Sequence, residues 1–387
     1  MNSTNLASLA VYGKEEMNLH PLKVVFYSII PSPYQRDLFH ALSQRPEINL
    51  QVYYLEAEVA DSPWSRKALQ AYEKVLPGFF LSWGASRFHF NWHLPNSRDA
   101  DVVVLNGYQN FTAQFLLWFY ANRVPCLFWG EKIVANSGGI KGRLQTFLVE
   151  GLKRCRAIVA IGSRAQQDYQ QRFSKHPIFN IPYYCNLSDF KSTVQRPRYP
   201  VTVFFCGQMI KRKGVDLLLQ AFDRLIQAGA EARLLLVGRE AELPEMLQSI
   251  SAEAQQHITY AGFHDPEYLP QFFEQADIFV LPSRYDGWGV VVNQALGAGL
   301  PIICSDAVGA ASDLVEAGVN GAIVPAGNAD ALYAALMHYV FHPDKIAAAS
   351  QTSIAKATAW TPEVGAKRWV EVLEKLTDLD EIHRKEM

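Results

Sequence analysis

The chain has 387 residues, of which 49% are apolar and 19% charged, and its formal net charge is −2. This composition is typical of a globular protein long enough for two domains, and it excludes a disordered chain. The balanced charge favours no nucleic-acid partner. The five cysteines include no C-x-x-C pair, which indicates buried reduced thiols and argues against a zinc site. Because residues 1–20 carry charges and no apolar run, we expect a cytoplasmic protein without a secretory signal.

In the first half of the chain, short apolar runs alternate with segments of helical spacing. Residues 1–21 are expected to be a loose lead-in, and a first domain is predicted over 22–188. A helix is predicted over 34–43, and the aromatic stretch 111–120 is interpreted as a buried helix. Strands are predicted at 23–30, 50–55, 102–105, 126–129, 157–161 and 179–181. This alternation predicts an open, mainly parallel α/β sheet.

A polar, proline-containing stretch at 189–200 predicts a linker to a second domain, 201–358. Strands are predicted there at 201–206, 233–237, 258–261, 277–281, 301–304 and 321–324, with helices at 215–227, 242–251 and 290–297. The tail 359–387 contains an amphipathic helix over 362–376, which we expect to pack back on the first domain. The fold class is therefore α/β, with two doubly wound Rossmann-like domains in tandem that face a central cleft.

The most informative segment is 276–299, ADIFVLPSRYDGWGVVVNQALGAG. An apolar strand ends at Pro282, and Gly287 and Gly289 then permit a sharp turn before a helix expected to begin near Gly289. Unpaired backbone N–H groups at a helix start can bind an anion. The carboxylate of Asp286 only accepts hydrogen bonds, so it suits sugar or ribose hydroxyls better than phosphate. The segment therefore predicts a nucleotide-sugar pocket.

The C-terminal half resembles the retaining, family 4 type glycosyltransferases of GT-B fold. The matching segments are 204–214, 235–238, 262–263, 276–299 and 319–324. The resemblance implies a hexosyltransferase-type enzyme whose donor is a nucleotide-diphospho-sugar, with no metal and no further cofactor. It also implies transfer with retention of anomeric configuration.

The resemblance assigns roles to individual residues of this second domain. A loop with Gly207 and Gln208, ending at Lys213, is implied to hold the diphosphate, and Gln208 stands where the family has arginine. Asp286 and Gln294 occupy the two glutamate positions of the family, which contact the donor sugar and the ribose. Gly287, Trp288 and Gly289 are implied to surround the phosphate or the sugar.

The first domain matches more loosely, through the segment 32–39 and a strand followed by Glu131, where relatives often carry histidine. The resemblance makes Glu131 a candidate catalytic residue that orients the acceptor hydroxyl or supports the oxocarbenium-like sugar; a salt-bridged loop acid is the alternative. The D-x-D triplets at 99–101 and 378–380 and the pair His89 and His93 lack the further ligands of a metal site.

Basic residues flank apolar ones along 141–156, in a pattern compatible with peripheral docking at the inner membrane face. A solvated helix of the α/β core explains the same pattern. We therefore predict a glycosyltransferase that acts on a saccharide or lipid-linked acceptor in polysaccharide or glycoconjugate biosynthesis. Two alternatives stay open: a non-catalytic sugar-nucleotide or glycan-binding protein on the same fold, and a nucleotide-sugar epimerase.

Overall fold

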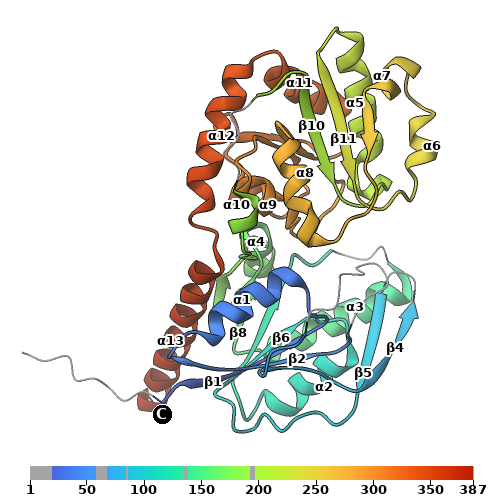
Figure 1. The fold of residues 1–387 in the computed structure, drawn as a ribbon. Helices are drawn as coiled ribbons and strands as arrows, with labels where there is room; N and C mark the ends of the chain where they lie inside the picture. Colours follow the sequence, from blue (N-terminus) through green and yellow to red (C-terminus); the bar gives the residue numbers. More distant parts are fainter. Residues whose placement is uncertain (1–19, 58–67, 84–85, 135–137, 192–196, 387) are drawn as a thin grey trace, which may run out of the picture.

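The computed structural model describes residues 20–57, 68–83, 86–134, 138–191 and 197–386 (Figure 1). Its two parallel sheets confirm the predicted α/β class. The N-terminal sheet has seven strands in the order β3-β2-β1-β6-β7-β8-β9, and the C-terminal sheet has six in the order β12-β11-β10-β13-β14-β15. Both orders reverse direction around a central strand, as in doubly wound folds.

The N-terminal domain comprises β1 (Leu22–Ser28), α1 (Pro33–Ser43), β2 (Ile48–Tyr54), β3 (Glu73–Val75), β4 (Gly78–Trp83), β5 (Ser86–Asn91), β6 (Val102–Asn106), α2 (Phe111–Tyr120), β7 (Cys126–Gly130), α3 (Gly139–Gly151), β8 (Ala157–Ala160), α4 (Ser163–Arg172) and β9 (Ile178–Asn180). Its central strands are continuous apolar runs because helices cover both faces of the sheet. One face packs on α1, and the other packs on α2, α3 and α4.

The C-terminal domain comprises β10 (Val201–Cys206), α5 (Val215–Gln227), β11 (Ala232–Val237), α6 (Leu243–Leu247), α7 (Ala252–Gln256), β12 (Ile258–Tyr260), α8 (Leu269–Gln275), β13 (Ile278–Leu281), α9 (Val291–Gly297), β14 (Ile302–Ser305), α10 (Ala311–Leu314), β15 (Gly321–Val324), α11 (Ala329–Val340) and α12 (Pro343–Ala357). Short 3-10 turns lie at Leu152–Arg154, Ser188–Phe190, Lys211–Lys213 and Pro266–Tyr268. All five cysteines are buried free thiols.

The last helix, α13 (Pro362–Glu386), runs beside α1 on the N-terminal domain (Figure 1). Trp369 is fully buried there, and its ring lies 5.1 Å from Phe26 and 5.6 Å from Trp129 between centroids. The chain therefore crosses between the domains twice. Among the described helices, none has both the length and the apolar character needed to cross a bilayer.

Several predicted elements differ from the structure. The antiparallel hairpin β4–β5 was not predicted: β4 (GFFLSW) lacks the alternation of a half-buried strand, although β5 (SRFHFN) alternates aromatic and polar residues. Helix α9 begins at Val291 and not at Gly289, and the predicted helix 242–251 is shorter in the structure, where α6 ends at Leu247 and a separate helix, α7, begins at Ala252. The stretch 111–120 is helical as predicted but only half buried, since Phe111, Phe115 and Trp118 are exposed.

Hydrogen bonds cross between the domains on one side of the cleft. The backbone N–H and hydroxyl of Ser163 donate to the Asp313 carboxylate at 3.0 and 2.7 Å, and Asn293 Nδ2 donates to the Tyr183 carbonyl at 3.1 Å. The carboxyl ends of β7, β8, β10 and β13 lead into this region, which is where ligands bind in open α/β sheets.

Candidate active site

Lys213 is positioned by a tight turn that follows β10. The chain passes Gly207 and Gln208, forms the 3-10 turn Lys211–Lys213, and reaches Gly214 with φ = +75°. A Cβ at Gly214 would lie 2.0 Å from the Pro282 carbonyl oxygen, so only glycine fits this close approach to the loop after β13. The turn brings Lys213 Nζ to 2.5 Å from Asp286 Oδ2. Two of the predicted catalytic residues are therefore in contact.

The loop that carries Asp286 is fixed by backbone hydrogen bonds to a neighbouring loop. The Asp286 N–H donates to the Ala307 carbonyl at 3.2 Å, and its carbonyl accepts from Gly309 N–H at 3.0 Å. The Trp288 carbonyl accepts from Ala310 N–H at 2.8 Å. Because the backbone is held on both sides, the carboxylate of Asp286 keeps its position beside Lys213.

Glu131 approaches the same loop from the N-terminal domain. It follows β7, and its carbonyl accepts a 2.5 Å hydrogen bond from the Tyr169 hydroxyl. A Cβ added to Gly287 would lie 1.6 Å from Glu131 Oε2, which shows how closely the side chain packs on the Asp286 loop. Among the described residues, no cation lies within ion-pair distance of this carboxylate, which disfavours the salt-bridged alternative.

Burial raises the pKa of Glu131 to about 7, and the nearby charge of Asp286 adds to this rise while Lys213 opposes it. A carboxyl group with a pKa in this range exchanges a proton near neutral pH, as general acids and bases do. The three predicted catalytic residues therefore influence one another electrostatically across the two domains.

Three tyrosines near the Glu131 carboxyl group were not predicted as site residues. Burial, followed by the charge of Glu131, raises the pKa values of Tyr34, Tyr183 and Tyr285, the last to about 12. The rings of Tyr34 and Tyr183 meet edge to face at 4.8 Å, and Arg212 Nη1 donates to the Tyr285 carbonyl at 3.1 Å. With their pKa values raised, these phenols remain neutral near Glu131.

A pocket of about 330 Å³ lies between the domains beside Asp286. Its C-terminal wall includes Tyr285, Asp286 and Gly287, and its N-terminal wall includes side chains of α4 and of the loop after β7. The lining residues of the N-terminal wall are Lys132, Ile133, Val134, Ile161, Arg164, Ala165, Asp168 and Arg172. The pocket has the size of a small-ligand site, and Asp286 is the predicted catalytic residue that lines it.

Arg164 is one of the charged residues of this pocket that were not predicted from the sequence. Its Nη1 atom is buried and has no hydrogen-bond partner among the described residues, whereas Arg172 pairs with Asp168 at 2.8 Å. The three residues recur at intervals of four on α4 and so share one face of the helix. In the sequence, this spacing is the one pattern that could have identified Arg164 as a site residue. A buried guanidinium nitrogen without a partner favours an anionic or hydroxyl-rich ligand.

Gln294 lies on α9, and its Oε1 atom is buried without a hydrogen-bond partner among the described residues. A buried amide oxygen without a donor can accept a hydroxyl hydrogen, as the predicted ribose contact requires. The ribose role itself stays a prediction.

Trp288 has a buried side chain, and the predicted contact of the Gly287–Gly289 amides with the donor stays a prediction. Its side chain is only 1% exposed, its indole N–H donates to Asn293 Oδ1 at 2.8 Å, and a Cβ at Gly162 would lie 2.5 Å from its ring. The ring is therefore wedged between the domains, and only its backbone remains for donor contact. Gly289, with φ = +88°, permits the turn before the seven-residue α9.

The weaker metal candidates have other partners. Asp99 pairs with the Lys23 ammonium, and Asp101 accepts from Lys23 N–H at 2.8 Å. His89 is buried 3.2 Å from Glu56, and the described residues contain no group of three or more potential metal ligands. The side chains of Asp378 and Asp380 lie outside the described residues.

Comparison with known proteins supports this description. Residues 200–340 match the family model of "Glycosyl transferases group 1". The phosphatidyl-myo-inositol mannosyltransferase of Mycobacterium leprae is 30% identical over 232 residues, which cover 58% of this chain and 55% of the relative. The alpha-D-kanosaminyltransferase of Streptomyces kanamyceticus is 27% identical over 124 residues, 32% of each chain. The chain thus spans about half, or less, of the length of these curated relatives.

Solved structures extend the likeness to nearly the whole chain. The sucrose-phosphate synthase of Thermosynechococcus elongatus matches with a TM-score of 0.73 at 18% identity, over 92% of this chain and all of the other. Anabaena HepE in complex with UDP matches with a TM-score of 0.68 at 15% identity, over 92% and 100% of the two chains. At such identities the likeness shows the fold. Residues 200–340 are similar to the group 1 glycosyl transferases, and the chain as a whole has the two-domain GT-B fold.

Proposed function

We propose that this protein is a retaining glycosyltransferase that moves a sugar from a nucleotide-diphospho-sugar to a saccharide or lipid-linked acceptor in polysaccharide or glycoconjugate biosynthesis. The observation that carries the proposal is the convergence of Lys213, Asp286 and Glu131 from two domains on one interdomain site. The family match of the C-terminal domain supports sugar transfer, and Anabaena HepE was solved in complex with UDP.

The ion pair suits a donor that carries both phosphate and hydroxyl groups. A lysine ammonium has three N–H donors, so Lys213 can hold Asp286 with one and a phosphate oxygen with another. The Asp286 carboxylate has a second oxygen that can accept from a sugar hydroxyl. As the C1–O bond to the diphosphate breaks, the charge of Lys213 stabilises the negative charge that develops on the departing oxygen.

The acceptor approaches from the N-terminal domain. Its hydroxyl oxygen forms the new bond to C1 on the face that the diphosphate leaves, and its proton passes to the departing phosphate oxygen. Glu131, when ionised, stabilises the positive charge that develops at C1. Arg164 and Lys132, on the same wall of the pocket, would position the rest of the acceptor.

The test is an assay of the purified chain with a panel of UDP-, GDP- and ADP-sugars and with oligosaccharide and lipid-linked acceptors. We expect transfer from one donor class, with the anomeric configuration of the product retained by NMR. Donor isomerisation without transfer would contradict the proposal in favour of an epimerase. Donor binding without turnover across the panel would contradict it in favour of a binding protein.

A further inference from the structure

The N-terminal domain exposes an unusual number of large aromatic side chains on adjoining elements. Trp118 and Phe115 of α2 are 65% and 50% exposed, and Phe147 of α3 is 73% exposed. Phe79 and Leu81 of β4, and Trp92 just after β5, are also exposed. We call these six residues the aromatic surface. Contiguous exposed apolar groups of this kind mark a site of interaction with a membrane or a partner.

Helix α2 has the sequence FTAQFLLWFY, without a single charged residue. Leu116, Leu117 and Tyr120 are buried against the sheet, as expected of an inner face. Phe111, Phe115 and Trp118 recur at intervals of four and three, so they share the outer face, where a surface helix ordinarily carries polar residues. Solvent contact alone does not explain an apolar outer face.

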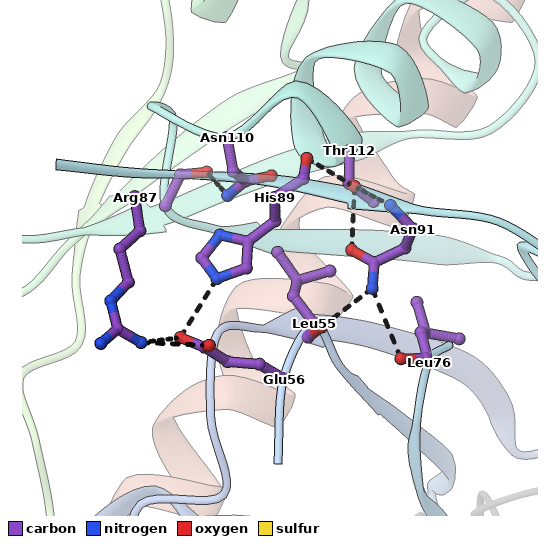
Figure 2. A network of polar contacts seen from close by, with 9 residues as sticks. Leu55, Glu56, Leu76, Arg87, His89, Asn91, Asn110 and Thr112 are labelled. Carbon is purple, nitrogen blue, oxygen red and sulfur yellow. Dashed lines mark hydrogen bonds and ion pairs between the residues drawn. The ribbon is translucent and has the colours of Figure 1, made fainter. Parts of the chain in front are cut away.

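Polar contacts hold the hairpin that carries Phe79 and Leu81 against the rest of the N-terminal domain (Figure 2). Arg87 Nη1 lies 3.1 Å from both carboxylate oxygens of Glu56, and His89 Nε2 lies 3.2 Å from Oε1 of the same residue. Asn91 Nδ2 donates to the Leu55 carbonyl at 2.8 Å, and the Thr112 hydroxyl donates to Asn91 Oδ1 at 2.9 Å. The hydrogen bonds of Arg87 and Asn91 hold the hairpin against the residues that follow β2 and against α2.

Ring contacts join the hairpin and α2 into one continuous surface. Phe79 stacks on Phe90 at 5.2 Å between centroids, and Phe90 stacks on Phe111 of α2 at 4.7 Å. Helix α3 adjoins α2, since Gln114 Nε2 donates to the Leu148 carbonyl at 2.9 Å. The aromatic residues are therefore held on neighbouring, fixed elements.

Positive charges accompany the aromatic surface. The Arg87 guanidinium lies 4.4 Å from the Phe80 ring centroid, and those of Arg98 and Arg123 each lie 5.0 Å from that of Phe119. On α3, Arg143 is exposed between Ile140 and Phe147, and Lys153 and Arg154 follow the helix. Glu56 pairs with Arg87 and Glu150 pairs with Lys153 at 2.5 Å, so the surplus positive charge here comes from Arg98, Arg123, Arg143 and Arg154. Exposed aromatics beside basic side chains match the boundary between acyl chains and anionic headgroups.

We propose that the aromatic surface docks this protein on an anionic lipid bilayer, with the aromatic rings at the level of the headgroups. The proposal rests on the proposed function for one step, which is that a lipid-linked acceptor would enter from this side. Val134 lines the interdomain pocket, and its carbonyl accepts a 2.6 Å hydrogen bond from Gln145 Nε2 of α3. The pocket wall and the aromatic surface are thus joined through α3.

The test is flotation of the full chain with phosphatidylcholine vesicles, with and without phosphatidylglycerol, in the absence of donor and acceptor. We expect the wild type to float with the anionic vesicles. Phe115→Ser/Trp118→Ser should reduce the bound fraction by about tenfold or more, because two aromatic side chains no longer enter the interface. At low salt, Arg143→Gln/Arg154→Gln should reduce the binding to anionic vesicles by about fivefold for each charge removed. At high salt the variant and the wild type should not differ.

The matched control is Phe263→Ser/Phe341→Ser, which removes two exposed aromatics of the other domain and should float like the wild type. Thermal unfolding of each variant checks that it is folded. Equal flotation of the Phe115→Ser/Trp118→Ser variant and the wild type, or no flotation at all, overturns the proposal. The proposal is also overturned if the wild type sediments as a dimer and the Phe115→Ser/Trp118→Ser variant as a monomer, because the surface would then bind a second copy of the chain. Unchanged transfer to a water-soluble acceptor by the variant separates loss of docking from loss of the proposed activity.

Discussion

Lys213 and Asp286 form an ion pair, with Nζ 2.5 Å from Oδ2, although 73 positions separate them in the chain. The turn at Gly214 and the hydrogen bonds of the Asp286 loop hold the two partners from opposite sides. Both side chains are mostly shielded from solvent, at 17% and 12% exposure. Such shielding strengthens their interaction with each other and with any charged ligand.

The first prediction concerns the charge of Lys213. Lys213→Ala should lower the transfer rate by about 100- to 1,000-fold, since it removes the cation that stabilises the departing diphosphate. The control is Lys211→Ala, in the same 3-10 turn but with an exposed side chain, which should keep most of the activity. Initial rates at saturating donor measure both. Loss of activity to the same extent in both variants would show that the turn, and not Lys213, matters.

The second prediction concerns the pH dependence that Glu131 causes. Its pKa is raised to about 7 in the folded protein, so we expect transfer to rise with pH and to reach half its maximum near pH 7. Glu131→Gln should abolish this dependence together with most of the activity. Transfer rates measured from acidic to mildly alkaline pH check this, and an unchanged profile in the variant would exclude Glu131.

The same raised pKa has a consequence for stability with a definite sign. The unfolded chain ionises Glu131 near 4.5, so the native state loses relative stability as pH rises from there to about 7. Glu131→Gln should therefore stabilise the protein above pH 7, on the order of 1 to 3 kcal/mol, and much less at low pH. Denaturant unfolding at several pH values measures this, with the exposed Glu267→Gln as control.

The third prediction concerns the contact between Gly287 and Glu131. Because an added Cβ would lie 1.6 Å from Glu131 Oε2, Gly287→Ala should displace this carboxylate and lower activity, while the free energy of unfolding falls by only about 1 kcal/mol because the end of the Glu131 side chain can rotate away. The double variant Gly287→Ala/Glu131→Ala should recover the stability but not the activity. Equal destabilisation of the single and double variants would mean that the strain arises elsewhere.

The fourth prediction concerns Gln294, whose Oε1 atom is buried and unpaired among the described residues. If this residue contacts the ribose, Gln294→Glu should tighten donor binding by about five- to tenfold, because hydrogen bonds to a charged acceptor are stronger. Gln294→Ala should weaken binding instead. Titration calorimetry with the active donor measures both, and a glutamate that binds more weakly than alanine would contradict the ribose role.

The sequence was sufficient for the α/β class because the buried strands are apolar runs bounded by glycine and proline, as at 277–281. It also identified Lys213, Asp286 and Glu131, which the fold brings together. Arg164 and the tyrosines at 34, 183 and 285 were missed as site residues, because their roles depend on how two domains pack and not on local pattern. The apolar stretch 111–120 was interpreted as a buried helix because hydrophobicity alone does not distinguish a buried face from an exposed apolar one.

The most direct test of the account is titration calorimetry of the wild type and Lys213→Ala with UDP-, GDP- and ADP-sugars. The account predicts that at least one donor binds the wild type and that Lys213→Ala weakens this binding by about ten- to a hundredfold, because a phosphate loses its charged partner. No binding across the panel, or equal binding by the two proteins, would contradict the assignment of this interdomain site to a nucleotide-diphospho-sugar.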